Sequence, residues 1–103
     1  MPVVRISRGS FQPEDHDRVR ARLQVSAASL VPAIRRLKGC LHYWAGIERV
    51  RNTMVNVSVW ETMEDAEQMA TLAPMLALAQ EFVALGVTFE RPILNYETLW
   101  ISS

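Results

Sequence analysis

Two segments in the middle of the chain alternate residue by residue, and in both segments each face carries apolar or aromatic side chains. In Cys40–Glu48 one set is Leu41, Tyr43, Ala45 and Ile47, and the other is Cys40, His42, Trp44 and Gly46. In Met54–Glu61 the sets are Val55, Val57 and Val59 against Met54, Asn56, Ser58 and Trp60. A period of two predicts neighbouring strands of one sheet, joined by a turn at residues 50–53. Because neither face is polar throughout, both faces of that sheet have to be covered.

The flanking segments complete the order of elements. Strands are predicted at Val3–Ser7, Cys40–Glu48, Met54–Glu61 and 87–101, the last as a strand or a hairpin, and helices at 13–38 and 62–85. Pro13 suits the first helical turn and Gly39 the end of that helix. Thr62 begins the second helix with a capping-box pattern, Pro74 restarts it and Gly86 ends it. The order β-α-β-β-α-β predicts an α+β, ferredoxin-like fold with two helices on one face of a four-stranded antiparallel sheet.

Length and charge narrow the class of protein further. A chain of 103 residues is expected to form a single domain, residues 1–103. Because 11 Lys and Arg residues balance 11 Asp and Glu residues, neither nucleic acid nor an anionic membrane is an expected partner. No apolar run approaches the ~20 residues that cross a membrane. The single cysteine, Cys40, excludes an intrachain disulfide and leaves a metal cluster without thiolates, so no metal is expected and the cytoplasm is the expected location.

The sheet face opposite the helices needs a cover of its own. We expect a homodimer in which the two sheets close face to face, because an apolar sheet face does not stay exposed to water. A cavity between the sheets, on the face away from the helices, is then expected to hold a small hydrophobic or aromatic ligand.

The run Val57–Ala66, which reads Val-Ser-Val-Trp-Glu-Thr-Met-Glu-Asp-Ala, resembles one family of such folds. It is similar to the antibiotic biosynthesis monooxygenase (ABM) superfamily of dimeric α/β barrels, in which the third strand ends in Trp-Glu-Ser/Thr before an acid and an alanine. The Gly39-Cys40 pair and the closing segment Pro92–Trp100 fit the same family. The resemblance covers nearly the whole chain, and its motifs specify the fold more than a reaction.

The resemblance implies a cofactor-independent monooxygenase-like protein acting on a small aromatic or polyketide-like compound. In relatives that oxidise anthrones to quinones, an asparagine and a tryptophan four residues apart on the third strand take part in the site, and Asn56 and Trp60 match them. The tyrosine that those enzymes place on the second helix falls near Ala66, which has no hydroxyl. The haem-degrading relatives need an asparagine on the first strand and a histidine on the second helix, and this chain has neither, so no cofactor is expected.

The residues themselves suggest roles in such a reaction. Oxygen reacts with an electron-rich anion, so a base and donors to an oxyanion are needed. We expect His42 to be the base, Asn56 and Trp60 to be the donors, and Trp44 to be a stacking wall. Arg5 and Ser58 are candidate substrate-binding residues, with Arg5 holding an anionic group. By alternation His42, Trp44, Asn56, Ser58 and Trp60 can share one face of the sheet, although the hairpin register is not readable from the sequence.

Each candidate also fits a structural role, and other functions remain open. His42 and Trp60 suit core packing, Asn56 suits a bond to a neighbouring strand, and Arg5 suits the surface, where His16 is also expected. The alternative functions are a non-catalytic small-molecule-binding dimer of the same fold and a lactone isomerase-like enzyme.

Overall fold

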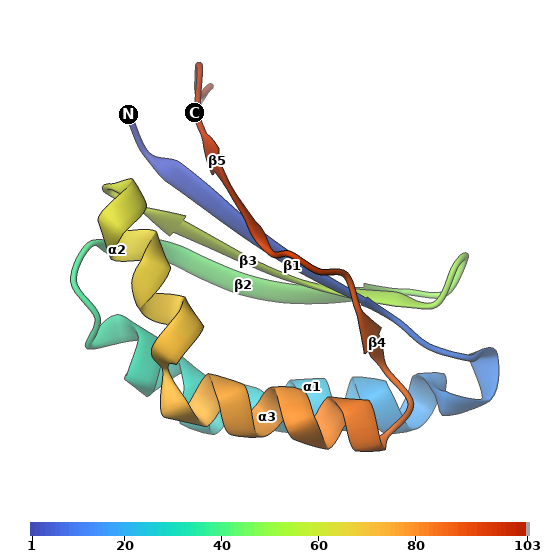
Figure 1. The fold of residues 1–103 in the computed structure, drawn as a ribbon. Helices are drawn as coiled ribbons and strands as arrows, with labels where there is room; N and C mark the ends of the chain where they lie inside the picture. The colour runs from blue at the N-terminus through green and yellow to red at the C-terminus, as the bar shows by residue number, and fades with distance from the viewer. Residues whose placement is uncertain (103) are drawn as a thin grey trace.

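The computed structural model describes residues 1–102 and confirms the predicted α+β, ferredoxin-like fold (Figure 1). Ser103, the last residue of the predicted domain, lies outside the described residues. The strands are β1 (Val3–Ser10), β2 (Cys40–Glu48), β3 (Thr53–Trp60), β4 (Thr88–Phe89) and β5 (Leu94–Glu97). The helices are α1 (His16–Arg35), α2 (Met63–Glu67) and α3 (Ala73–Ala84), with 3₁₀ helices η1 (Pro13–Asp15) and η2 (Gln68–Thr71). Within residues 1–102, every helix is too short or too polar to span a membrane.

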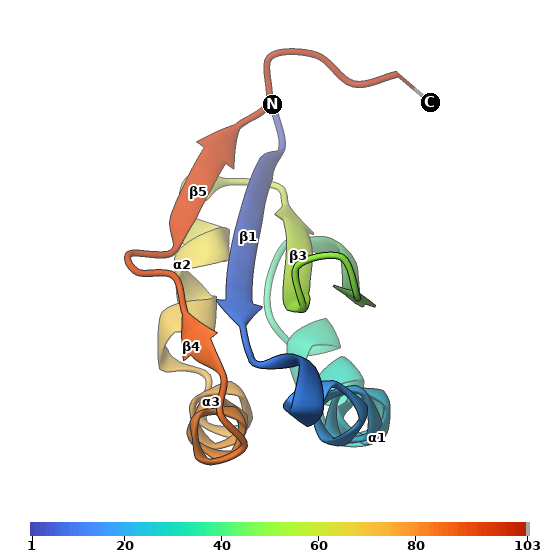
Figure 2. The same ribbon diagram turned by 90° about the vertical axis from the view of Figure 1, so that its right-hand side faces the viewer.

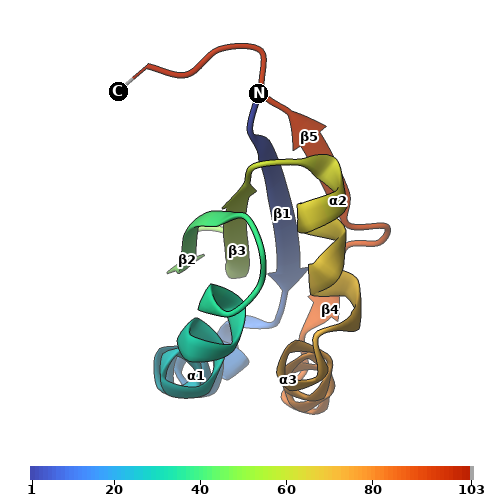
Figure 3. The same ribbon diagram turned by 90° about the vertical axis from the view of Figure 1, so that its left-hand side faces the viewer.

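The sheet is antiparallel, with strand order β2-β3-β1-β4, and β5 continues along β1 beyond β4. Figures 2 and 3 view it from opposite ends and show α1 and α3 side by side beneath the same face, with α1 under β2 and β3 and α3 under β4. We call the face toward the helices the inner face and the opposite one the outer face. The hydrophobic core lies between the inner face and the helices, and its largest buried side chains include Trp60, Phe82, Leu30, Ile34 and Met54.

Proline and glycine divide the chain much as predicted. Pro13 opens the 3₁₀ turn before α1, and Gly39 adopts a left-handed φ of 78° after that helix, where a side chain would overlap the Asp65 carboxylate. Thr62 caps α2, its hydroxyl accepting a hydrogen bond from the Asp65 amide at 3.0 Å. Pro74 stands in the first turn of α3, so the predicted second helix is built as α2, η2 and α3.

Two local predictions differ from the structure. The predicted closing strand is two short strands, β4 and β5, because the segment around Pro92 leaves the ladder with β1, and proline has no amide hydrogen to donate. His16, expected at the surface, is 1% exposed. Its Nδ1 lies 3.1 Å from the Asn52 Oδ1, and its ring packs edge-on against Phe11 with centroids 5.6 Å apart. The turn between β2 and β3 therefore covers this histidine, a contact that helical periodicity does not reveal.

The register of the β2–β3 hairpin decides which side chains share a face. Glu48 pairs with Thr53 across the connection formed by residues 49–52, so even-numbered residues of β2 lie opposite odd-numbered residues of β3. Tyr43 is therefore opposite Ser58 and Trp44 is opposite Val57. A bulge between Cys40 and His42 absorbs one extra residue near the start of β2. Tyr43 consequently lies on the inner face and Trp44 on the outer face.

Candidate functional site

Polar side chains occupy four adjoining positions on the inner face, which is otherwise lined mainly by apolar side chains that pack against the helices. Arg5 pairs with Ser58, and Ser7 pairs with Asn56, so the four form a compact patch across β1 and β3. The alternation of each strand places all four on the same side as Trp60, which is buried in the core. Ser58 is buried and the other three are half-buried, and polar groups withdrawn from water need partners, so this polar floor between sheet and helices marks a candidate binding site.

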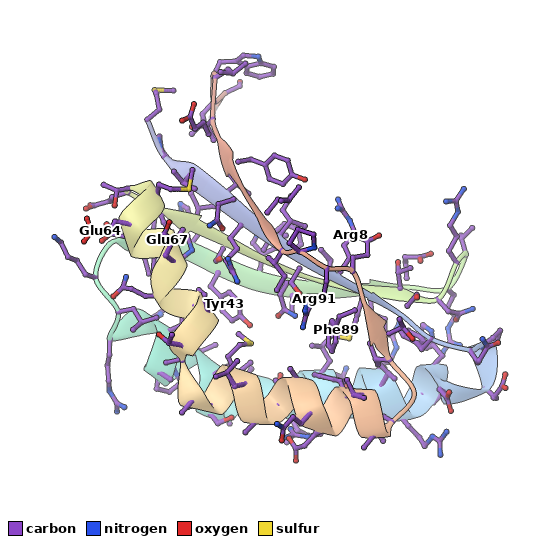
Figure 4. The ribbon with its side chains drawn as sticks, viewed as in Figure 1. Arg8, Tyr43, Glu64, Glu67, Phe89 and Arg91 are labelled. Carbon is purple, nitrogen blue, oxygen red and sulfur yellow. The ribbon has the colours of Figure 1, made fainter. Side chains whose placement is uncertain are left out.

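The helices do not close onto this floor. A cavity of about 420 Å³ lies between it and the segment from η2 to α3, within the ~300–1,000 Å³ typical of small-molecule sites. Its apolar wall includes Met69, Met75, Leu78, Phe82 and Phe89. Arg91 and the adjoining residues 92 and 93, between β4 and β5, complete the lining. Figure 4 shows Tyr43, Phe89 and Arg91 on the helix side of the sheet, whereas Arg8 projects from its other side.

The Asn56 amide is held by a side chain from the neighbouring strand. The Tyr43 hydroxyl donates to the Asn56 Oδ1 at 2.8 Å. With the oxygen engaged by Tyr43, the amide nitrogen of Asn56 faces away from that hydroxyl, and it has no hydrogen-bond partner within residues 1–102. Burial, with a smaller contribution from Cys40, raises the pKa of Tyr43 to about 12, so the hydroxyl remains a donor at neutral pH. Tyr43 thus fixes an N–H donor at the cavity.

Ser58 is oriented in a similar way by Trp60. The Trp60 indole Nε1 donates to the Ser58 Oγ at 2.8 Å, and both side chains are buried. Because Ser58 accepts this bond, its own hydroxyl hydrogen is available to donate toward the cavity that it lines. Trp60 is 0% exposed and does not itself line the cavity, so it acts on the site through Ser58.

Arg5 brings a positive charge to the same floor. It is half-buried, and its Nη1 donates to the Asn95 Oδ1 on β5 at 3.1 Å. Burial lowers the pKa of Arg5, and the nearby positive charge of Arg91 lowers that pKa further. Both guanidinium groups line the cavity, which makes it electropositive. The sequence suggested either the surface or an anion-holding role for Arg5, and the structure excludes an exposed strand position.

His42 and Trp44 lie on the other side of the sheet. They pair with Val59 and Val57, so both are on the outer face, and both are exposed. The prediction that they share a face with Asn56 is therefore wrong, because the hairpin register opposes residues of unlike parity. The expected location of the cavity is wrong for a related reason. The polar floor belongs to the inner face, so the cavity lies between sheet and helices, and His42 does not line it.

Among residues 1–102, the cavity lining carries no carboxylate, histidine or thiol. Nor do residues 1–102 contain a group of three or more His, Cys, Asp or Glu side chains placed to hold a metal ion. The groups that line the site are therefore hydrogen-bond donors and cations. Such a set stabilises negative charge on a bound molecule, and within the described chain it offers no side chain that takes up a proton at neutral pH.

Sequence reasoning missed three contributors to this site, which are Ser7, Tyr43 and Arg91. Ser7 was assigned only to the end of the first strand, yet β1 runs on to Ser10 and carries Ser7 opposite Asn56. Once Glu48 is known to pair with Thr53, the alternation of β2 places Tyr43 on the same face as Ser58 and Asn56. Arg91 had no periodic signal, because it lies in the irregular segment between β4 and β5.

Comparison with known proteins bears on the fold. No family model and no curated protein matches the sequence. Among solved structures, a candidate antibiotic biosynthesis monooxygenase from Deinococcus radiodurans aligns with a TM-score of 0.74 and 19% identity, over 98% of this chain and 96% of that one. The chain has the fold of the antibiotic biosynthesis monooxygenases. This confirms the resemblance to the ABM superfamily at the level of the fold.

Two further structures show the same ABM fold over nearly their whole length. Rv0793 from Mycobacterium tuberculosis aligns with a TM-score of 0.70 and 18% identity, over 100% of both chains. SnoaB, a cofactor-independent oxygenase from Streptomyces nogalater, aligns with a TM-score of 0.64 and 21% identity, over 97% of this chain and 95% of that one. Several solved structures therefore share the fold of this protein.

Proposed function

We propose that the protein is a cofactor-independent monooxygenase-like enzyme that acts on a small aromatic or polyketide-like compound in the cavity beneath the inner face. The observation that carries this proposal is the Asn56 amide, oriented by Tyr43 at 2.8 Å on a polar floor facing an apolar wall. Such a floor binds the oxygen atoms of a planar compound while the wall covers its rings. The likeness in fold to a cofactor-independent oxygenase supports the same reading.

The proposed chemistry begins with ionisation of the substrate. Asn56 and Ser58 stabilise an enolate or phenolate by donating hydrogen bonds to its oxygen, and the positive charge of Arg5 favours the anionic form. The proton passes to water, since no basic side chain within residues 1–102 lines the cavity. The electron-rich anion then reacts with O₂. For an anthrone, one oxygen atom becomes the new carbonyl of the quinone, and the other leaves as water with the two hydrogens of the substrate methylene group.

Oxygen consumption with anthrone as the substrate tests this function. We expect uptake above the spontaneous rate, with quinone carrying one ¹⁸O atom when ¹⁸O₂ is supplied. Asn56→Ala should lower the rate by about a hundredfold, the usual cost of losing one oxyanion donor. Gln80→Ala is the matched control, because it removes an exposed amide from α3 that does not line the cavity. Uptake that is equal for Asn56→Ala and the unmodified protein would exclude Asn56 from the reaction.

The second candidate is a non-catalytic small-molecule-binding dimer, and the lack of any carboxylate, histidine or thiol in the cavity lining favours it. A lactone isomerase-like enzyme needs a base at the bound substrate, and the lining supplies none. Binding of anthrone without oxygen uptake or quinone formation would support the binding protein.

We also infer that the protein is a homodimer built on the outer face. That face carries Val4, Ile6, Val55, Val57, Val59, Leu94, Tyr96 and Trp44. Trp44, Leu94 and Tyr96 are 53%, 51% and 46% exposed, and the helices of residues 1–102 lie on the opposite side of the sheet (Figure 1). A largely apolar sheet face of this kind, interrupted by Arg8 and His42, is typical of an interface between subunits. Because the cavity lies on the inner face, pairing through the outer face leaves its lining in place.

The remaining expectations from the sequence belong to the same proposal. We infer that the whole chain forms one domain of this fold and that it acts in the cytoplasm. The free thiol of Cys40 is consistent with a reducing compartment.

A further inference from the structure

The part of the chain that the structure describes lines the cavity with two arginines and no acidic side chain. Arg5 and Arg91 both line it, and they are close enough for Arg91 to lower the pKa of Arg5. The ion pairs found within residues 1–102 lie elsewhere, as Arg18–Asp15, Arg22–Glu81 and Arg49–Asp17. The partner of Arg5 is a neutral amide, the Oδ1 of Asn95 at 3.1 Å. The cavity therefore carries excess positive charge that no acidic side chain of residues 1–102 neutralises.

This arrangement is unfavourable in an empty protein. A half-buried cation loses part of its hydration, and such groups are normally paired with an opposite charge. A second guanidinium in the same cavity adds repulsion between like charges. Arg91 is partly accommodated by the face of the Phe89 ring, with its Cζ 5.1 Å from the ring centroid. A ligand with a permanent negative charge would relieve the repulsion between the two arginines and replace the lost hydration of Arg5.

We propose that Arg5 and Arg91 form an anion subsite that binds the carboxylate of a planar aromatic acid. This rests on the proposed function, since it names the substrate class for the same cavity. Guanidinium groups bind carboxylates through paired N–H donors, and Arg5 retains donors beyond the one engaged with Asn95. The apolar wall, which includes Met75 and Phe82, provides the surface for the rings. An anion without an apolar body would leave that wall uncovered.

The β1–β3 register sets the distance between the subsite at Arg5 and the Asn56 amide, where the reacting oxygen of the substrate is proposed to bind. Arg5 is opposite Ser58, and Asn56 is two residues further along the same face of β3. Two residues of a strand span about 6.6 Å. This separation is comparable to one six-membered ring with a substituent at each end. The carboxylate at Arg5 would therefore place an oxygen on the far side of the ring near the Asn56 amide.

Binding of two matched probes tests the subsite. 2-Naphthoate and 2-naphthamide have the same rings and nearly the same shape, and they differ in charge. Isothermal titration calorimetry should show 2-naphthoate binding about tenfold or more tightly than 2-naphthamide, the scale of a charge-assisted hydrogen bond. Arg5→Gln and Arg91→Gln should each reduce this preference to about twofold or less while leaving the affinity for 2-naphthamide nearly unchanged.

Arg8→Gln is the matched control for charge. Arg8 lies on β1 like Arg5 but is exposed on the outer face, and Figure 4 shows it across the sheet from Arg91. Its removal changes the net charge by the same amount and should leave the preference for 2-naphthoate intact. Retained binding of 2-naphthamide shows that each variant is folded. Arg91 is exposed in an irregular segment, so its variant provides a test even where Arg5→Gln fails to fold.

The outcomes separate this proposal from the proposed function. Equal binding of the two probes would overturn the carboxylate subsite and leave the aromatic cavity standing. Loss of the preference in Arg8→Gln to the same extent as in Arg5→Gln would also overturn it, because a general electrostatic field would then explain the effect. Binding of neither probe would overturn both the subsite and the proposed aromatic substrate. A preference for 2-naphthoate that depends on Arg5 and Arg91 alone would support the subsite.

Discussion

Replacing Tyr43 with phenylalanine removes one hydroxyl group and leaves the packing of the ring in place. The lost interaction is the 2.8 Å hydrogen bond to the Asn56 Oδ1. Because the ring keeps its contacts, the change leaves no void in the packing. The expected loss is that of one hydrogen bond, about 1 kcal/mol in the free energy of unfolding. For a domain of this size, that lowers the Tm by about 4–8 °C.

A double-mutant cycle measures this interaction apart from other effects. Urea unfolding of Tyr43→Phe, Asn56→Ala, the double variant and the unmodified protein gives four free energies, all taken at one protein concentration because a dimer's stability depends on it. The bond predicts a coupling energy of about 0.5–1.5 kcal/mol between the two sites. Oxygen uptake by Tyr43→Phe should also fall, since the Asn56 amide is then free to rotate.

A coupling energy below about 0.3 kcal/mol would refute the reasoning, because that is the range in which independent sites are additive. The Asn56 amide would then be positioned by something other than Tyr43, and the central argument for an oriented donor would fail.

Three further predictions follow from other parts of the structure. The pKa of Tyr43 is raised from 10.0 to about 12, so the contribution of its hydroxyl to stability is full below pH 10 and is lost as the pH rises to about 12. In unfolding curves measured at alkaline pH, the stability difference between the unmodified protein and Tyr43→Phe should therefore shrink over that window. Gly39→Ala should lower the free energy of unfolding by about 1–2 kcal/mol or more, measured by urea unfolding, because φ is 78° and the new methyl group would overlap Asp65; an unchanged midpoint would contradict this. Trp44→Glu should convert the proposed dimer to a monomer in analytical ultracentrifugation, whereas a protein that is monomeric before the change would refute the interface.

The order and type of the elements were predictable because local chemistry determines them. Alternation in Cys40–Glu48 gave a strand with the same boundaries as β2, and Gly39 ends the preceding helical segment through its left-handed φ. Thr62 caps α2 as the capping-box pattern predicts. Each of these signals depends on residues within a few positions of one another, and a single sequence carries that information in full.

The composition of the site was only partly predictable, because it depends on register. Asn56 and Ser58 share one face because alternation within a strand is a local property, and the β1–β3 register brings Arg5 to the same face. Whether Tyr43 or Trp44 joins them depends on how the connection at residues 49–52 aligns the two strands, which the alternation of either strand does not reveal.

The side of the sheet that holds the cavity was not predictable either. A polar patch on one face is compatible with a gap between two subunits or with a gap beneath the helices. The outcome here follows from the packing of η2 and α3, which line the patch without filling it. The contribution of Arg91 depends on that same packing, because it enters from an irregular segment with no periodic pattern.

The burial of Trp60 gives the protein an internal optical reporter. Trp100 is 79% exposed, so acrylamide in solution can quench its fluorescence, whereas Trp60 is 0% exposed and shielded from it. A Trp44→Phe variant removes the third indole, which lies on the face assigned to the dimer. The emission that survives quenching therefore comes from an indole whose N–H is bonded to Ser58, a residue that lines the cavity. A ligand that accepts a hydrogen bond from the Ser58 hydroxyl changes the polarity of the environment of that indole. Binding in the cavity is therefore measurable from the Trp60 fluorescence emission without an added dye.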